Sequence, residues 1–222
     1  MIPLYDTLRA RRFPAITVFL VILNALVFYY ELRLGKAGLE DFIRTWGLIP
    51  SNLLRNLETA WPTIFSSMFI HGGWFHLLSN MWVLLIFGDN IEDRLGRLRY
   101  LFFYGLGGLA AALMQVYILR NSETPMVGAS GAIAAVLGAY LVLYPRARIA
   151  SLVPILFIFT IVEIPAVIFL LFWFVSQLFP GWLALGGGTG SGIAWWAHIG
   201  GFVFGMAGGP LLAPRRVYYS HY

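Results

Sequence analysis

The chain has 222 residues, of which 59% are hydrophobic and only 11% are charged, and its mean hydropathy is +0.77. Soluble domains average about 45–50% apolar and about 25% charged residues, so this composition excludes an ordinary soluble enzyme and a disordered chain. The absence of cysteine excludes disulfides, a thiolate metal site and a cysteine nucleophile. The net charge of +5 comes from basic residues in short clusters between apolar runs, which favours membrane topology over nucleic-acid binding.

Six apolar runs predict transmembrane helices, since a helical span needs roughly 20 apolar residues. They are Phe13–Tyr30, Ile64–Gly88, Tyr100–Leu119, Val127–Tyr144, Ala150–Phe179 and Ile193–Leu212. The fifth run is too long for one straight span and contains Pro154, Glu163 and Pro165. We therefore expect its first turns to lie along the interface, or its helix to be tilted and kinked. The predicted fold class is an all-α, polytopic membrane protein with six transmembrane helices.

The basic residues predict the orientation of these helices. We expect a single membrane domain with an N-terminal segment at 1–12, a six-helix core at 13–212 and a tail at 213–222. Ten basic residues fall on one side and five on the other, and positive residues favour the cytoplasm. Both termini are therefore expected in the cytoplasm, and the 31–62 and 181–192 loops on the outer face. The ten are Arg9, Arg11, Arg12, Arg94, Arg97, Arg99, Arg146, Arg148, Arg215 and Arg216; the five are Arg33, Lys36, Arg44, Arg55 and Arg120.

Polar residues inside the predicted spans are candidate functional groups, because they are costly in a membrane. His76 and Asn80 are four residues apart and share one helix face. Ser130 stands at the outer end of the fourth run, and His198 near the outer end of the sixth. Each also has a structural interpretation, since a serine can simply allow close helix packing and a buried histidine can simply be hydrogen-bonded.

Glycines in the fourth and sixth runs predict close packing between the two helices: Gly131 and Gly138 in one, Gly201 and Gly205 in the other. If these helices touch, Ser130 can act as a nucleophile and His198 as its base. Free N–H groups at a helix start suit an oxyanion, and His76 and Asn80 could add side-chain donors. No acidic residue lies close to His198 in sequence, so a dyad is expected and not a triad.

The other polar clusters do not predict a metal or nucleotide site. His71 and His76 are five residues apart without a carboxylate neighbour, and the glycine-rich 186–192 segment lacks the lysine of a phosphate-binding loop. This segment is expected to be a flexible loop, and the fifth helix with the Gly181–Gly192 loop is expected to form a gate. The acidic cluster lacks the spacing of a calcium loop and is expected to pair with basic neighbours: Asp89, Glu92 and Asp93 with Arg94 and Arg97.

Three segments carry a His-xxx-Asn, a Gly-x-Ser-Gly and an Ala-His-x-Gly motif in this order: 71–100, 127–140 and 195–205. They are HGGWFHLLSNMWVLLIFGDNIEDRLGRLRY, VGASGAIAAVLGAY and WWAHIGGFVFG. Together with six spans, they resemble the rhomboid intramembrane serine proteases. The resemblance implies that Ser130 is the nucleophile and His198 the general base. It also implies an oxyanion hole made by His76, Asn80 and the Ser130 N–H.

The resemblance further assigns supporting roles to Gly128 and Gly131 and implies a prokaryotic inner-membrane protein whose site opens to the outer face. Its substrates would be transmembrane proteins, cut within or beside the lipid bilayer, with no cofactor, no metal and no nucleic acid; the oligomeric state stays open. Many members place an aromatic ring four residues after the serine, where this chain has Ala134. The orientation of His198 must then come from other packing, from the Trp195/Trp196 pair or from Gly131.

Three alternatives remain at this stage. The first is a catalytically inactive rhomboid-like protein that binds membrane clients. The second is a small transporter or channel with His76, Asn80 and Glu163 along a polar pathway, and the third is a membrane scaffold. For Glu163, a structural role competes with a proton relay.

Overall fold

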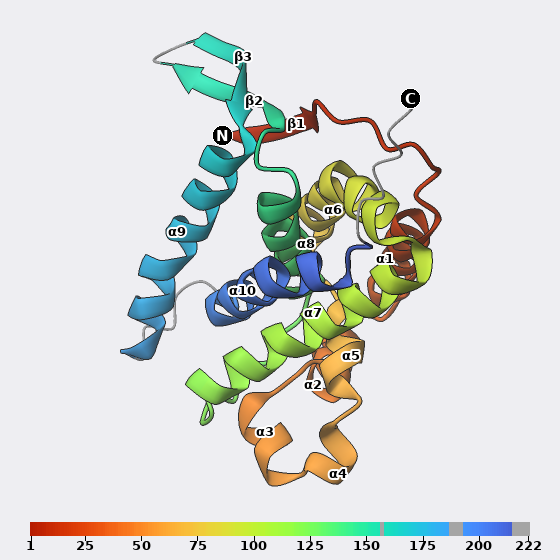
Figure 1. Ribbon diagram of the computed structural model, residues 1–222. Coiled ribbons are helices and arrows are strands. Elements are labelled where there is room, and N and C mark those ends of the chain that lie inside the picture. The colour runs from red at the N-terminus through yellow and green to blue at the C-terminus, as the bar shows by residue number, and fades with distance from the viewer. Residues whose placement is uncertain (156–157, 187–192, 215–222) are drawn as a thin grey trace, which may run out of the picture.

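The computed structural model describes residues 1–155, 158–186 and 193–214. These residues form a mostly helical molecule with one small sheet (Figure 1). In chain order the elements are β1 (Ile2–Asp6), α1 (Ala15–Arg33), α2 (Gly35–Trp46), α3 (Pro50–Arg55), α4 (Leu57–Ala60), α5 (Thr63–Ser66), a 3-10 turn (Ser67–Phe69), α6 (Trp74–Leu95), α7 (Arg97–Ile118), α8 (Ser130–Leu143), β2 (Arg148–Ile155), β3 (Ile158–Pro165), α9 (Ala166–Leu185) and α10 (Trp195–Leu212).

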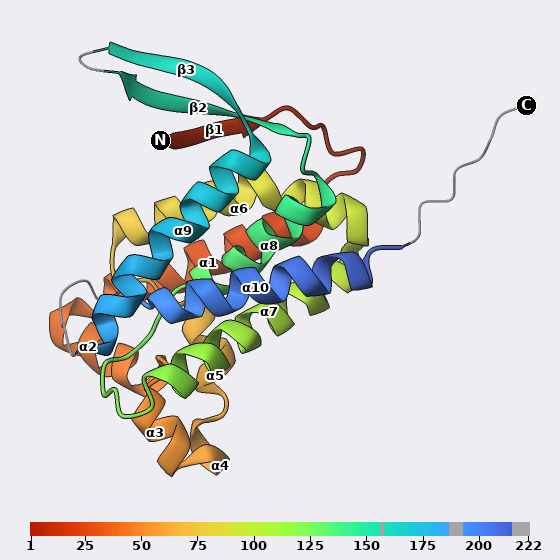
Figure 2. The same cartoon turned by 60° about the vertical axis from the view of Figure 1, so that its left-hand side comes forward.

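Helix α8 is the centre of the bundle. Every residue from Ala132 to Leu141 is buried, and α8 contacts α6, α7, α9 and α10. The surrounding helices are visible around it in Figures 1 and 2. Since a helix that is apolar on all sides can be stable only when it is covered on all sides, the sequence of α8 matches its position.

Glycines bring α8 and α10 into backbone contact. A Cβ at Gly201 would overlap the carbonyl oxygen of Gly131, and a Cβ at Gly205 would overlap that of Ala135. On α8, a Cβ at Gly138 would overlap the carbonyl oxygen of Phe202. The predicted glycine-mediated packing is confirmed, and it fixes the separation between the two helices that carry Ser130 and His198.

Within the described residues, three helices are long and apolar enough to cross a membrane: α1, α7 and α9. A fourth span results if the bent pair Thr63–Phe69 and Trp74–Leu95 is counted as one. Large apolar side chains are exposed on these helices, such as Phe19, Leu113 and Phe172. Such surfaces match lipid and not water, and the molecule is an integral membrane protein.

The predicted fifth span is wrong in its first half. Residues of the 150–179 run form β2 and β3, an antiparallel hairpin, and the helix begins only at Ala166. Glu163 therefore lies on a strand, where its Oε2 is 3.4 Å from Arg148 Nε and both side chains are about half exposed. Both interpretations offered for this run assumed a helix; the isoleucines, valines and threonine of the segment favour a strand instead.

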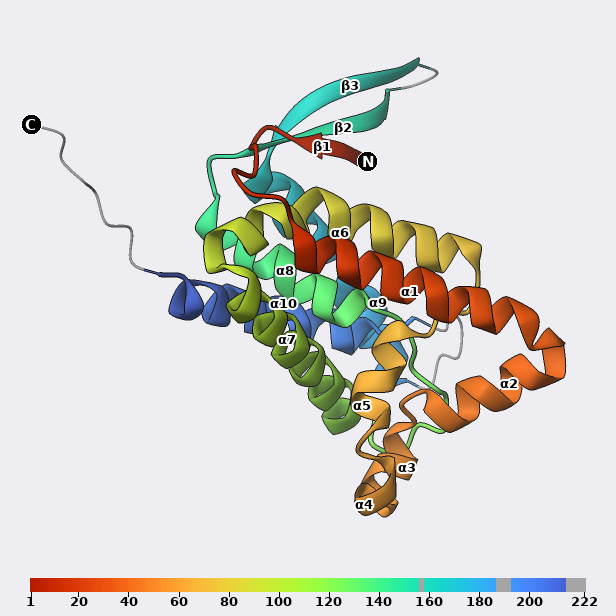
Figure 3. The same ribbon diagram turned by 90° about the vertical axis from the view of Figure 1, so that its right-hand side faces the viewer.

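The predicted second span also begins too early. The chain bends by 94° between Thr63–Phe69 and Trp74–Leu95, and His71 lies in the break. The continuous helix begins at Trp74, directly before His76. The 31–62 loop, for which no elements were predicted, contains α2, α3 and α4, at the end of the molecule opposite the sheet (Figure 3).

The N-terminal residues complete the sheet. Strand β1 pairs antiparallel with β2, giving the order β1-β2-β3 beyond the end of α8 (Figure 3). Asp6 ends β1 and accepts hydrogen bonds from the Tyr140 hydroxyl of α8 and from Asn90 Nδ2 of α6, the latter at 2.9 Å. The sheet, α6 and α8 are therefore joined at one carboxylate.

The expected ion pairs of the acidic cluster are also corrected. Glu92 accepts hydrogen bonds from the backbone N–H groups of Ile16 and Thr17, at 3.0 and 2.8 Å, and from Thr17 Oγ1 at 2.9 Å. Because Pro14 offers no side-chain cap, this distant carboxylate satisfies the first N–H groups of α1. Its neighbours bond elsewhere: Asp93 accepts from the Arg11 N–H, and Arg94 donates to the Pro214 carbonyl.

Candidate active site

Ser130 and His198 meet at the contact between α8 and α10. Ser130 is the first residue of α8 and His198 is the fourth of α10. Ser130 Oγ lies 2.8 Å from His198 Nε2, and the histidine is 9% exposed. A serine hydroxyl bonded to an imidazole nitrogen is the arrangement that nucleophilic catalysis requires.

The other ring nitrogen of His198 has a partner that the sequence reasoning missed. Nδ1 lies 2.9 Å from Oε1 of Gln177, a buried residue of α9. The sequence carries a signal, since Gln177 is a polar residue inside an apolar run, but Gln177 lacks the charge that distinguishes Glu163 in the same run. The Ser130–His198 pair is therefore extended by a neutral amide from a third helix.

Two tryptophans pack against the His198 ring. Trp173 of α9 lies 5.9 Å away, ring centroid to centroid, and Trp195 of α10 lies 6.0 Å away, edge to face. Trp195 was one of the residues expected to replace the missing aromatic at Ala134, whereas Trp196 instead donates to the Gly181 carbonyl at 2.9 Å. Trp173, one helical turn before Gln177, was not expected.

His76 and Asn80 of α6 face the segment that precedes Ser130. Gly128 has φ +116°, and an added Cβ would lie 2.5 Å from His76 Nε2 and 3.6 Å from Asn80 Nδ2. Asn80 Nδ2 is buried and, among the described residues, has no hydrogen-bond partner. A buried donor without a partner is costly unless another acceptor occupies the space, so this amide is available to one.

A small cavity adjoins Ser130. It has a volume of about 10 Å³ and is lined by Gly128, Ser130, Gly131, Ala197 and nine further residues. This is at the lower limit of the space that one water molecule needs. Helix α8 begins at Ser130, so the free N–H groups of its first turn and the positive end of the helix dipole lie beside the serine and this cavity.

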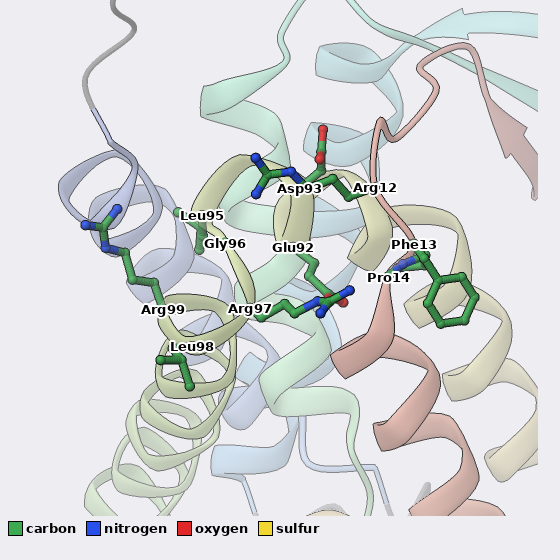
Figure 4. Close-up of a pocket in the computed structure, with 10 residues that line it drawn as sticks. All are labelled: Arg12, Phe13, Pro14, Glu92, Asp93, Leu95, Gly96, Arg97, Leu98 and Arg99. Atoms are coloured by element: carbon green, nitrogen blue, oxygen red, sulfur yellow. The ribbon is translucent and has the colours of Figure 1, made fainter.

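A second cavity, larger than the one beside Ser130, lies elsewhere. Its volume is about 640 Å³, and Figure 4 shows its lining, which comes from residues 12–14 directly before α1, the end of α6 and the start of α7. Along α6, Glu92 in this lining is 16 residues from His76, or roughly 24 Å of helix. Size alone therefore does not locate the serine site.

His71 lies behind the site. Its ring packs edge to face on that of His76 at 5.0 Å, and its backbone N–H donates to the Glu31 carboxylate of α1 at 3.0 Å. Within the part of the chain that the structure describes, no group of three histidine, cysteine, aspartate or glutamate side chains is arranged to hold a metal.

Comparisons with known proteins point to one family. The sequence model of the Rhomboid domain matches residues 58–215. RHOMBOID-like protein 4 of Arabidopsis thaliana is 33% identical over 83% of this chain and 42% of its own length. The mitochondrial Rhomboid protein 1 of Saccharomyces cerevisiae is 28% identical over 56% of this chain and 36% of its own. Rhomboid-like protease 5 of Toxoplasma gondii is 34% identical over 42% of this chain and 11% of its own.

The chain spans less than half the length of each of these relatives. The domain match itself covers more than half of this chain and includes His76, Asn80, Ser130 and His198. The chain belongs to the rhomboid family.

Proposed function

We propose that this protein is an intramembrane serine endopeptidase that cleaves transmembrane or membrane-proximal segments of other membrane proteins. The observation that carries the proposal is the 2.8 Å contact between Ser130 Oγ and His198 Nε2. Family membership and the protease named among the relatives support the same reaction class.

In the proposed mechanism, Ser130 attacks the substrate carbonyl while its hydroxyl proton passes to His198 Nε2. The negative charge on the carbonyl oxygen is stabilised by the Ser130 N–H, Asn80 Nδ2 and His76. His198 then gives the proton to the leaving amine, and water hydrolyses the acyl-enzyme. Gly128 and Gly131 support this site, Gly128 by letting the chain pass close to His76. The serine and the imidazole supply the nucleophile and the base, so the proposal needs no cofactor.

We also propose that residues 13–212 form one membrane domain of six spans. On that proposal both termini face the cytoplasm of a prokaryotic cell, and Ser130 opens to the outer face. The expected tail at 213–222 lies outside the described residues from 215 on, and the glycine-rich 186–192 loop lies outside them from 187 on.

A helical substrate hides its carbonyls in its own hydrogen bonds, so cleavage sites should lie in segments that unwind easily.

The test is cleavage of a reporter membrane helix by purified protein in liposomes. Wild type is compared with Ser130→Ala and with Ser79→Ala, an exposed serine of α6 that serves as the matched control. We expect cleavage by wild type and Ser79→Ala, and a loss of at least about 1000-fold in Ser130→Ala.

Two results would contradict the proposal. Equal cleavage by wild type and Ser130→Ala would require another nucleophile. No cleavage by folded wild type across several helix-destabilised reporters would instead favour the alternative function, a client-binding rhomboid-like protein without activity.

A further inference from the structure

Gln177 is the one described side chain of α9 that is hydrogen-bonded to His198. The two residues belong to different helices, and both are buried, at 6% and 9% exposure. The mechanism above uses only Nε2 of the ring, which leaves the role of Nδ1 and its partner to be explained.

The hydrogen bonds of the amide fix its direction. Gln177 Nε2 donates to the Trp173 carbonyl at 3.1 Å and to Ser176 Oγ at 2.9 Å. Both amide hydrogens are thereby used, and Oε1 is the atom that faces the histidine. An amide oxygen only accepts, so His198 Nδ1 must carry the hydrogen in this contact.

The direction of the amide decides the state of the other nitrogen. With hydrogen on Nδ1, neutral imidazole has its lone pair on Nε2, where Ser130 can donate. When Nε2 takes the serine proton, the Nδ1–H bond to Oε1 persists and strengthens, because its donor is then charged. In the opposite tautomer, Nε2–H would donate to Ser130 Oγ and could not accept the serine proton, and Oε1 would be left without a donor.

We propose that Gln177 is a positioning residue that holds His198 in the Nδ1–H tautomer, with α9 packed against α10. This inference rests on the proposed function for its catalytic meaning. The contact belongs to a seam of three residues four positions apart on α9, namely Trp173, Gln177 and Gly181. Each of them touches α10, so the geometry of the base depends on where α9 lies (Figure 2).

The kinetic test uses two replacements of similar length. Gln177→Met removes the acceptor, and we expect kcat to fall about 100-fold with little change in KM. Gln177→Glu keeps an acceptor and adds a charge, so kcat should stay within about tenfold of wild type. The acid limb of its pH–rate profile should move up by about one unit, because a carboxylate favours the imidazolium. His76 of α6 also interacts electrostatically with this ring and is present in all variants.

The matched control is Gln115 of α7, another buried glutamine whose amide contacts α10. Its Oε1 accepts the backbone N–H of Ala197 at 3.1 Å and does not touch the ring. Gln115→Met and Gln115→Glu can change the unfolding temperature, but their pH–rate profiles should match the wild-type profile. A shift of the acid limb in Gln115→Glu equal to that in Gln177→Glu would overturn the proposal.

A spectroscopic measurement of the His198 tautomer tests this inference independently of the proposed function. In protein with ¹⁵N-labelled histidine, the His198 ring signals are those that disappear in His198→Ala. We expect the Nδ1–H tautomer in wild type and its loss in Gln177→Met, whether or not the protein cleaves a reporter. Two results would overturn the proposal: an Nε2–H tautomer in wild type, or an Nδ1–H tautomer in Gln177→Met as in wild type. If Gln177→Met does not fold, Gln177→Glu tests the proposal. An Nδ1–H signal together with a shifted acid limb in this variant would support it, and the absence of either would overturn it.

Discussion

At the scale of single residues, Gly128 shows why the site needs a residue without a side chain. Its φ of +116° is accessible to glycine at low cost, whereas other residues at such angles are strained by about 1–3 kcal/mol. An added Cβ would also lie only 2.5 Å from His76 Nε2, which is too close for two unbonded atoms. The position is thus restricted by its backbone and by its neighbour at once.

We therefore expect Gly128→Ala to lower cleavage by about 100-fold or more, the usual effect of displacing an oxyanion donor. The measurement is kcat in the reporter assay beside the thermal unfolding temperature. Gly72→Ala is the control, because Gly72 lacks a positive φ and a Cβ there meets nothing within 4 Å. A Gly128→Ala protein with wild-type kcat would remove His76 from the proposed oxyanion hole.

The residues of the site could be predicted from sequence to the extent that they are chemically unusual in a span. Serine, histidine and asparagine stand out from apolar neighbours, and the glycines indicated which helices touch. Gln177 is polar as well, but its role depends on which face of α9 meets α10. That face is decided by packing between distant segments, and no local pattern records it.

At the scale of elements, α1 depends on a carboxylate from another helix. Glu92 satisfies two N–H groups in the first turn of α1, where Pro14 gives no cap. This contact fixes α1 against the end of α6.

Glu92→Ala should therefore lower stability by about 1–3 kcal/mol, because the buried N–H of Thr17 and the half-buried N–H of Ile16 lose their acceptor. Glu92→Gln, which keeps one oxygen, should have a smaller effect. The measurement is thermal unfolding in detergent, with Asp93→Asn as the control because its bond to the Arg11 N–H is long and exposed. Equal unfolding temperatures for Glu92→Ala and Asp93→Asn would contradict this role.

The hairpin is the element that sequence reasoning could not place. A continuous apolar run from Ala150 to Phe179 has the length of a long helix, and apolarity alone does not separate a buried strand from a helix. Pro154 and Pro165 were the available signals, and Pro165 does stand directly before the helix at Ala166. The pairing of β2 with β1 lies far outside any local window.

At the scale of the whole molecule, Asp6 joins the N-terminal strand to the bundle. Burial raises the pKa of the Asp6 carboxyl above its ordinary value, and the Tyr140 hydroxyl opposes this only in part. The folded state therefore favours the protonated acid. The corresponding stability is fully present below the ordinary pKa of about 3.9 and is lost as pH rises through the folded pKa.

Asp6→Asn keeps an oxygen for Tyr140 and Asn90 but cannot ionise. We expect the unfolding temperature of wild type minus that of Asp6→Asn to decrease as pH rises from about 4 to 8. Taking this difference cancels the titrating groups that do not interact with Asp6, whereas Asp89 interacts with it. A difference that increases with pH would mean that the fold prefers the ionised carboxylate.

The contacts of the N-terminal segment also constrain the order in which the protein assembles during synthesis. The Arg148 N–H donates to Thr7 Oγ1 across 141 positions, and the Thr17 N–H reaches Glu92 across 75. A chain made from its N-terminus presents β1 and the first turn of α1 long before their partners exist. α1 must therefore enter the membrane uncapped, and the edge of β1 stays open until more than half the chain has been made. During this period β1 is an unpaired strand, and the newly made protein is most exposed to misassembly.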